Sequence, residues 1–88
     1  MIAVANICIF CGSSNAVAQD YLDYASKLGR LCADARVNII YGGGCIGLMG
    51  ALADGAMDAG GTVIGVIPDF LNRKNIAHSG ISEMVITS

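Results

Sequence analysis

Four short apolar runs, separated by helical patterns and glycine-rich breaks, constrain the fold of this chain more than any other feature. The runs occupy residues 5–10, 37–41, 62–68 and 81–88. Helical patterns fill 16–36 and 46–60, whereas 69–80 reads as a loop with at most one helical turn. Strands that are continuously apolar and alternate with helices are typical of a parallel sheet covered on both faces. The sequence therefore predicts an α/β fold, a Rossmann-like doubly wound parallel sheet in the order β-α-β-α-β-loop-β.

The two helical patterns differ in how their apolar residues are distributed. In the first, Tyr21, Ala25, Leu28 and Cys32 recur at the spacing of one helix face, which predicts the buried stripe of an amphipathic helix. The second is apolar around most of its circumference, and such a helix is normally buried. We therefore expect the second helix to lie in an interface or beneath further protein. Its apolar residues are Leu48, Met49, Leu52, Ala53, Ala56 and Met57.

The composition is unusually apolar for so short a chain. Hydrophobic residues make up 55% and charged residues 14% of the 88 residues. A small domain has proportionally more surface and should be more polar than average, not less. In addition, the chain stops on its fourth strand, where an uncovered sheet edge would expose unpaired backbone groups. These features predict that residues 1–88 form a single partial domain that is truncated at its C-terminus.

Charge and cysteine usage exclude several classes of partner. A net charge of −2 with five basic residues lacks the basic surface that nucleic acid requires. No window reaches the roughly 18 apolar residues of a membrane span, and the apolar N-terminus lacks the basic start and cleavage site of a signal peptide. We therefore expect a cytoplasmic protein. Cys8 and Cys11 form a C-x-x-C, but no second pair or histidine stands at ligand spacing, so we interpret this pair as buried structural thiols and expect no metal site.

A glycine-rich turn follows the second apolar run directly. Gly42, Gly44 and Gly47 spell G-x-G-x-x-G between a strand and a helix. Glycines let backbone N–H groups approach a ligand, and the helix N-terminus that follows attracts anions. However, the motif follows the second strand, and no acidic residue stands in the strand-end context that a dinucleotide site requires. A nucleotide site and a simple packing corner both remain open, whereas an NAD site is disfavoured.

A second polar loop should lie beside this turn. Residues 11–15 (CGSSN) follow the first strand, as the glycine turn follows the second. Ligands of doubly wound sheets bind at the carboxyl ends of the strands. We therefore expect Gly12, Ser13, Gly43 and Gly44 to line one shared cleft.

Three segments, CIFCGSSN, IIYGGGCIGLMGALADGAMDAGG and VIGVIPDFL, resemble the N-terminal half of the Lonely Guy family in order and spacing. Members are Rossmann-like homodimers that release the base from a nucleoside 5′-monophosphate, a cytokinin ribotide or AMP, and leave ribose 5-phosphate. The resemblance implies the same reaction, a homodimer and no cofactor. It also implies that the nucleotide is contacted by the following residues: Gly12, Ser13, Gly42, Gly43, Gly44, Gly47, Met49 and Asn75.

The resemblance stops short of the family's catalytic residues. Its second signature, P-G-G-x-G-T-x-x-E, and the Arg-Lys motif before it belong beyond Ser88. The only proline here is Pro68, and Arg73-Lys74 precedes the fourth strand and not a helix after it. A family glutamate in the loop after the third strand is replaced by Asn75. We therefore expect no catalytic residue in this chain, and the alternatives are an inactive nucleotide-binding fragment or a structural half-domain. Among the remaining polar residues, Asp69 lies nearest the expected site, and His78 is more typical of a surface or partner contact.

Overall fold

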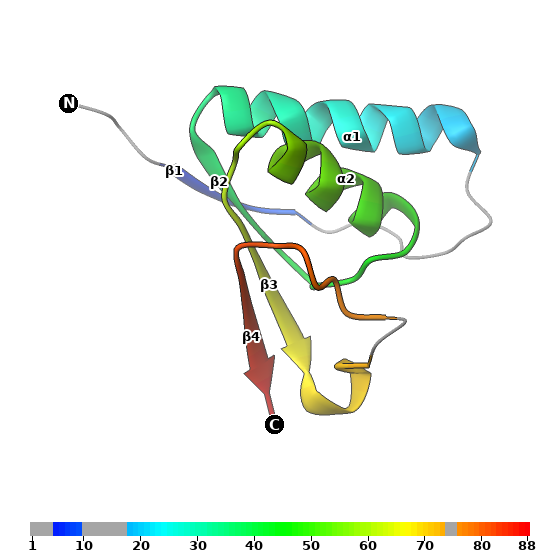
Figure 1. Ribbon diagram of the computed structural model, residues 1–88, viewed down its shortest axis with the longest axis vertical. Coiled ribbons are helices and arrows are strands. Elements are labelled where there is room, and N and C mark those ends of the chain that lie inside the picture. The colour runs from blue at the N-terminus through cyan, green and yellow to red at the C-terminus, as the bar shows by residue number, and fades with distance from the viewer. Residues whose placement is uncertain (1–4, 10–17, 74–75) are drawn as a thin grey trace.

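A computed structural model of the chain describes residues 5–9, 18–73 and 76–88, and it confirms the predicted order of elements (Figure 1). The single turn of 3-10 helix after the third strand matches the helical turn expected there. The elements are β1 (Ala5–Cys8), α1 (Gln19–Asp34), β2 (Val37–Tyr41), α2 (Gly47–Asp58), β3 (Val63–Pro68), the 3-10 turn (Asp69–Leu71) and β4 (Glu83–Thr87).

The strands form one parallel sheet in the order β1-β2-β3-β4. Their carboxyl ends therefore lie at the same edge, as predicted. Both helices lie on the same side of the sheet, where they are in contact with each other (Figure 1). Right-handed crossovers that step repeatedly in one direction put their helices on one face. The expected helices on both faces are consequently not found in the described part of the chain.

The core lies between this helix layer and alternate residues of the central strands. Ile39 and Tyr41 of β2 and Val63 of β3 point toward the helices and are buried. Leu52, Ala53 and Ala56 of α2 and Cys32 of α1 complete the cluster. Of the apolar residues predicted to be buried in α2, these three are buried, whereas Leu48, Met49 and Met57 are half-buried. The cover comes from α1 and the sheet of the same chain, and an interface for α2 stays a prediction.

The two helices meet at their backbones. A Cβ atom at Gly29 of α1 would collide with the carbonyl oxygen of Leu52, and one at Gly55 of α2 with the carbonyl oxygen of Ser26. Only glycine permits this approach, so the face of α1 that contacts α2 runs through Gly29 and Ser26. The predicted stripe is wrong for Tyr21, which is 62% exposed, and for Leu28. The glycine contact selects a different face of α1 to pack against α2.

Cys8 also differs from its interpretation as a buried thiol. Cys32 is buried in the core, but Cys8 and Cys45 are exposed. Cys8 sits in β1, all of whose residues are exposed, and Cys45 lies between the glycine turn and α2. Cys11 is outside the described residues. An apolar neighbourhood in sequence did not bury Cys8, because all of β1 is exposed among the described residues.

Candidate functional site

The glycine turn connects the buried end of β2 to the start of α2. Gly43 has φ +77° and Gly47 has φ +63°, both in the left-handed region that side chains disfavour. The chain thereby leaves β2 at Tyr41, reverses over Gly42–Gly44 and enters α2 at Gly47. The backbone geometry therefore requires Gly43 and Gly47 whether or not a ligand binds at the turn.

Protein hydrogen bonds hold the turn through its carbonyl groups. The Tyr41 hydroxyl donates to the carbonyl oxygen of Gly44 at 2.9 Å. The backbone N–H of His78 donates to the carbonyl oxygen of Gly43 at 2.8 Å, and that of Cys45 to the carbonyl oxygen of Ile76 at 2.9 Å. In contrast, the N–H groups of Gly43 and Gly44 donate to no acceptor among the described residues. The turn is therefore fixed by its contacts with Tyr41 and with the loop before β4.

An apolar cavity of about 310 Å³, which we call the turn cavity, lies against this turn. It brings together three residues that the resemblance assigned to the nucleotide: Gly42, Gly44 and Met49. The remaining walls come from the N-cap of α2, the end of β3, the 3-10 turn and the loop before β4. The cavity is lined by Gly42, Gly44, Ile46, Met49, Ile67, Leu71 and Ile76.

Met49 packs directly over the two glycines of the turn. A Cβ atom at Gly42 would lie 2.5 Å from the Met49 methyl carbon, and one at Gly44 would lie 2.7 Å from its sulfur. Side chains at these positions would therefore displace Met49 into the cavity. The volume falls at the small end of ligand sites, and the apolar walls suit a planar base or a hydrocarbon substituent. Without a basic residue in its lining, the turn cavity is poorly suited to a phosphate group.

The other predicted contacts do not join this cavity. A Cβ atom at Gly43 would meet Met84 and Ile67, so Gly43 faces the sheet. Gly47 lines a different pocket. Gly12, Ser13 and Asn75 lie outside the described residues, so the shared cleft with the first loop stays a prediction. Sequence reasoning missed the hydrophobic walls formed by Ile46, Ile67, Leu71 and Ile76, because apolar residues in such a sequence are indistinguishable from core.

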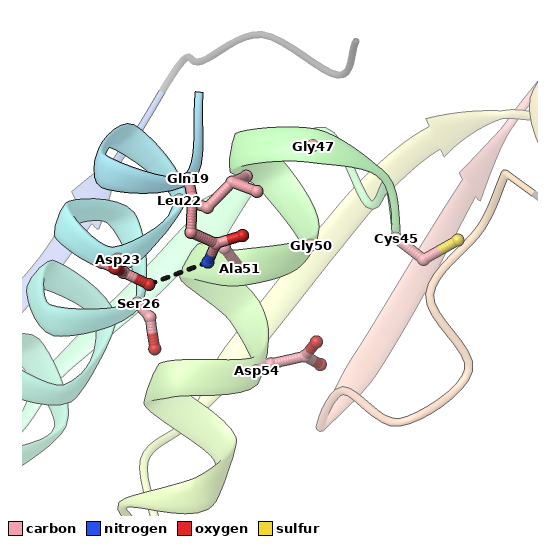
Figure 2. Close-up of a pocket in the computed structure, with 9 residues that line it drawn as sticks. All are labelled: Gln19, Leu22, Asp23, Ser26, Cys45, Gly47, Gly50, Ala51 and Asp54. Atoms are coloured by element: carbon pink, nitrogen blue, oxygen red, sulfur yellow. Dashed lines mark hydrogen bonds between the residues drawn. The ribbon is translucent and has the colours of Figure 1, made fainter. Parts of the chain in front are cut away.

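A second pocket, of about 380 Å³, lies between the two helices (Figure 2). Asp23 of α1 and Asp54 of α2 line it, and no basic residue does. Gln19 donates from its side-chain amide to Asp23 at 2.9 Å, whereas Cys45 points away from the other lining residues (Figure 2). Two carboxylates would repel a phosphate. This pocket is therefore a poor nucleotide site despite the presence of Gly47.

A third pocket, of about 610 Å³, opens beside β4 and the loop before it. It contains both Arg73 and Glu83, and the Arg73 Nε–H donates to the carbonyl oxygen of Phe70 at 3.1 Å. None of the glycine-turn residues reaches this pocket. Asp69, the acid expected nearest the site, is exposed at the start of the 3-10 turn and does not line the turn cavity.

One polar pair near the turn was missed entirely. His78 Nε2 lies 2.6 Å from Asp54 Oδ1, across 24 residues of sequence. The sequence predicts Asp54 to be a solvated helix residue and His78 to be a surface or partner contact. No periodicity links a residue of α2 to one of the loop before β4, so only the fold reveals this pair.

Comparison of the sequence with protein families and named relatives identifies the family of this chain. A model of the SLOG cluster4 family matches residues 4–88. The chain belongs to this family. The SLOG chain is 41% identical over 78 residues to a protein of Oryza sativa subsp. japonica named probable cytokinin riboside 5′-monophosphate phosphoribohydrolase, covering 89% of this chain and 34% of that protein. It is 40% identical over 80 residues to a Rhodococcoides fascians protein of the same name, without "probable", covering 90% and 40%.

These relatives are much longer than the match. The SLOG chain spans between about a third and two-fifths of their length. Among solved structures, it resembles the Moco carrier protein of Chlamydomonas reinhardtii, with a TM-score of 0.74 and 27% identity over 96% of this chain and 48% of that one. Of the helices described, neither is long and apolar enough to cross a membrane.

Proposed function

We propose that this SLOG chain forms the base-binding part of a nucleoside 5′-monophosphate phosphoribohydrolase. The reaction hydrolyses the N-glycosidic bond of a cytokinin ribotide or AMP and yields the free base and ribose 5-phosphate. The observation that carries the proposal is the turn cavity, in which Gly42, Gly44 and Met49 of the family signature meet. The names of the relatives supply the reaction.

The chemistry of the cavity supports a binding role and not a catalytic one for this segment. Glycosidic hydrolysis passes through an oxocarbenium-like state and needs a carboxylate to stabilise it or to activate water. The turn cavity has no ionisable residue in its lining. We therefore assign the catalytic carboxylate and the phosphate contacts to the part of the relatives that this chain does not match. Residues 1–88 are accordingly one part of a longer Rossmann-like domain.

Activity measurements test this division of roles. Purified chain, incubated with AMP, should release no adenine detectable by chromatography, because the positioned charge that usually dominates rate enhancement is missing. A chimera that continues the chain with the matching C-terminal part of the Rhodococcoides fascians relative should release adenine. Release by the 88-residue chain at a rate near that of the relative would place the catalytic residues in this segment instead.

Binding measurements test the turn cavity itself. Gly42→Ala should weaken AMP binding by about tenfold, because the new methyl group drives Met49 into the cavity. Combining Gly42→Ala with Met49→Ala should restore part of the affinity by returning the lost space. Asp58→Ala, an exposed substitution on the helix that carries Met49, is the control and should bind AMP as the wild type does. Equal affinities for all of these variants would place the nucleotide elsewhere.

A binding module without hydrolysis is the second candidate, and the purely apolar lining of the turn cavity favours it. It predicts that both the 88-residue chain and the chimera bind AMP and that neither releases adenine. A structural half-domain, the third reading, predicts no AMP binding at all. The same two assays therefore separate all three.

The exposed side of α1 supports the homodimer. Tyr21, Tyr24, Leu28 and Leu31 are all exposed and recur at spacings of three, four and three residues. Each is preceded by a charged residue, acidic in the first half of the helix and basic in the second. These are Asp20, Asp23, Lys27 and Arg30. Two copies of α1 packed antiparallel about a twofold axis would place acidic halves against basic halves.

The oligomeric state of charge-introducing variants tests this interface. Leu28→Lys should convert the dimer to a monomer in sedimentation velocity, whereas Lys27→Ala should leave most of it intact, because flanking exposed charges contribute little. A wild-type chain that sediments as a monomer at every concentration would rule the α1 interface out. We also propose that the protein is cytoplasmic, a compartment in which thiols such as those of Cys8 and Cys32 remain reduced.

A further inference from the structure

The imidazole of His78 is bonded at both nitrogens. Its Nε2 lies 2.6 Å from Asp54 Oδ1, and the backbone N–H of Gly80 donates to its Nδ1 at 2.9 Å. Because Nδ1 accepts that bond, Nε2 carries the proton and donates it to the carboxylate. The His78 side chain is 12% exposed, while that of Asp54 is 63% exposed. The ring is therefore held in one orientation between α2 and the loop that precedes β4.

The backbone on either side of this ring is bonded to the glycine turn. The N–H of His78 donates to the carbonyl oxygen of Gly43, and the carbonyl oxygen of Ile76 accepts from the N–H of Cys45. These two bonds form an antiparallel bridge around Gly44 and Ala77. The loop before β4 and the glycine turn consequently move as one unit, and the His78 side chain ties this unit to α2.

The contact between Asp54 and His78 affects three walls of the turn cavity. Gly44 belongs to the turn, Ile76 to the loop and Met49 to α2, and all three line the cavity. The Asp54–His78 contact connects the helix that carries Met49 to the loop that carries Ile76. The distance between these walls therefore depends on the pair, although neither Asp54 nor His78 lines the turn cavity itself.

We propose that Asp54 and His78 are positioning residues that hold the turn cavity at the width its ligand requires. The inference rests on the proposed nucleotide site and adds to it a pair of residues that act without touching the nucleotide. A hydrogen bond to a largely exposed carboxylate contributes little to stability by itself. The pair matters here because its ring also fixes the loop through Gly80, and because the bonds to Gly43 and Cys45 pass that constraint to the turn.

Two conservative variants separate the two bonds of the ring. In His78→Gln the side-chain amide nitrogen can replace Nε2 and donate to Asp54, whereas in His78→Asn the amide oxygen can replace Nδ1 and accept from Gly80. Asp54→Ala removes the helix anchor alone. Asp58→Ala removes an exposed carboxylate one turn further along α2 and serves as the matched control.

Two measurements on the 88-residue chain are needed: amide hydrogen exchange at Cys45 and His78, and AMP affinity by titration calorimetry. Asp54→Ala and His78→Asn should speed exchange at both amides and weaken AMP binding by about fivefold, the effect of losing one partly exposed hydrogen bond. His78→Gln should recover most of the affinity. The double variant Asp54→Ala, His78→Asn should be no weaker than either single variant, because both remove the same contact.

The outcomes separate this proposal from the one on which it rests. Faster exchange with unchanged AMP affinity would make the pair a structural tie only and overturn the positioning role. Unchanged exchange in Asp54→Ala would show that the pair does not hold the turn, with the same consequence. A wild-type chain that binds no AMP would instead overturn the nucleotide site, and the positioning role with it.

Discussion

The two faces of the sheet use similar residues and bury them very differently. On the helix side of β3, Val63 is completely buried, and on the opposite side of the same strand Val66 is 40% exposed. Val85 of β4, paired with Val66, is exposed to the same extent. Strands of parallel sheets are apolar on both faces because each face is built to receive a layer. The difference teaches that burial here follows the helix layer and not the hydrophobicity of the strand.

The helix-covered face owes its packing to the contact of helix backbones, and Gly29→Ala tests this most severely. Its new methyl group would collide with the Leu52 carbonyl group, which cannot rotate away as a side chain can. We expect a loss of about 3 kcal/mol in the free energy of unfolding, or a failure to fold. Urea denaturation followed by circular dichroism measures it. Lys27→Ala, on the exposed side of α1, should change stability by less than about 0.5 kcal/mol.

A matched pair of valines in β3 compares the two faces directly. Val63→Ala should lower the free energy of unfolding by about 2 kcal/mol, because the buried side chain leaves a cavity beneath the helices. Val66→Ala should cost less than about 1 kcal/mol, since much of its side chain already contacts water. Thermal and urea unfolding of the two variants provide the comparison. Equal losses would mean that the two faces are covered alike in solution.

The smallest effect is expected at Val85 of β4, on the sheet face opposite the helices, which we call the open face. Val85→Thr keeps the branched shape and introduces a hydroxyl that water can reach, so stability should change by less than about 0.5 kcal/mol. The midpoint of urea unfolding, measured at several protein concentrations, tests this. A large loss that grows with protein concentration would reveal that association between copies covers the open face.

Local patterns were enough to predict the elements, and long-range contacts were not. The apolar run of β2, the glycine turn and α2 follow one another in sequence, so their junction could be predicted. Met49 was assigned to the site only through the family resemblance. The stripe of α1 was predicted only in part, because the packing face depends on where Gly29 meets Leu52 of another helix. Helical spacing defines which residues share a face, but it does not choose the face that a neighbouring helix will cover.

By itself, the sequence determined the alternation of strands and helices and the glycine turn, since each depends on residues within one short segment. The parallel sheet followed from that alternation. Only the tertiary structure decided which walls close the turn cavity, which face of the sheet is covered and that His78 meets Asp54. These features join residues from separate elements, such as Ile76 from the loop and Met49 from α2. Their distances depend on how whole helices and strands pack, a property that no local pattern of side chains encodes.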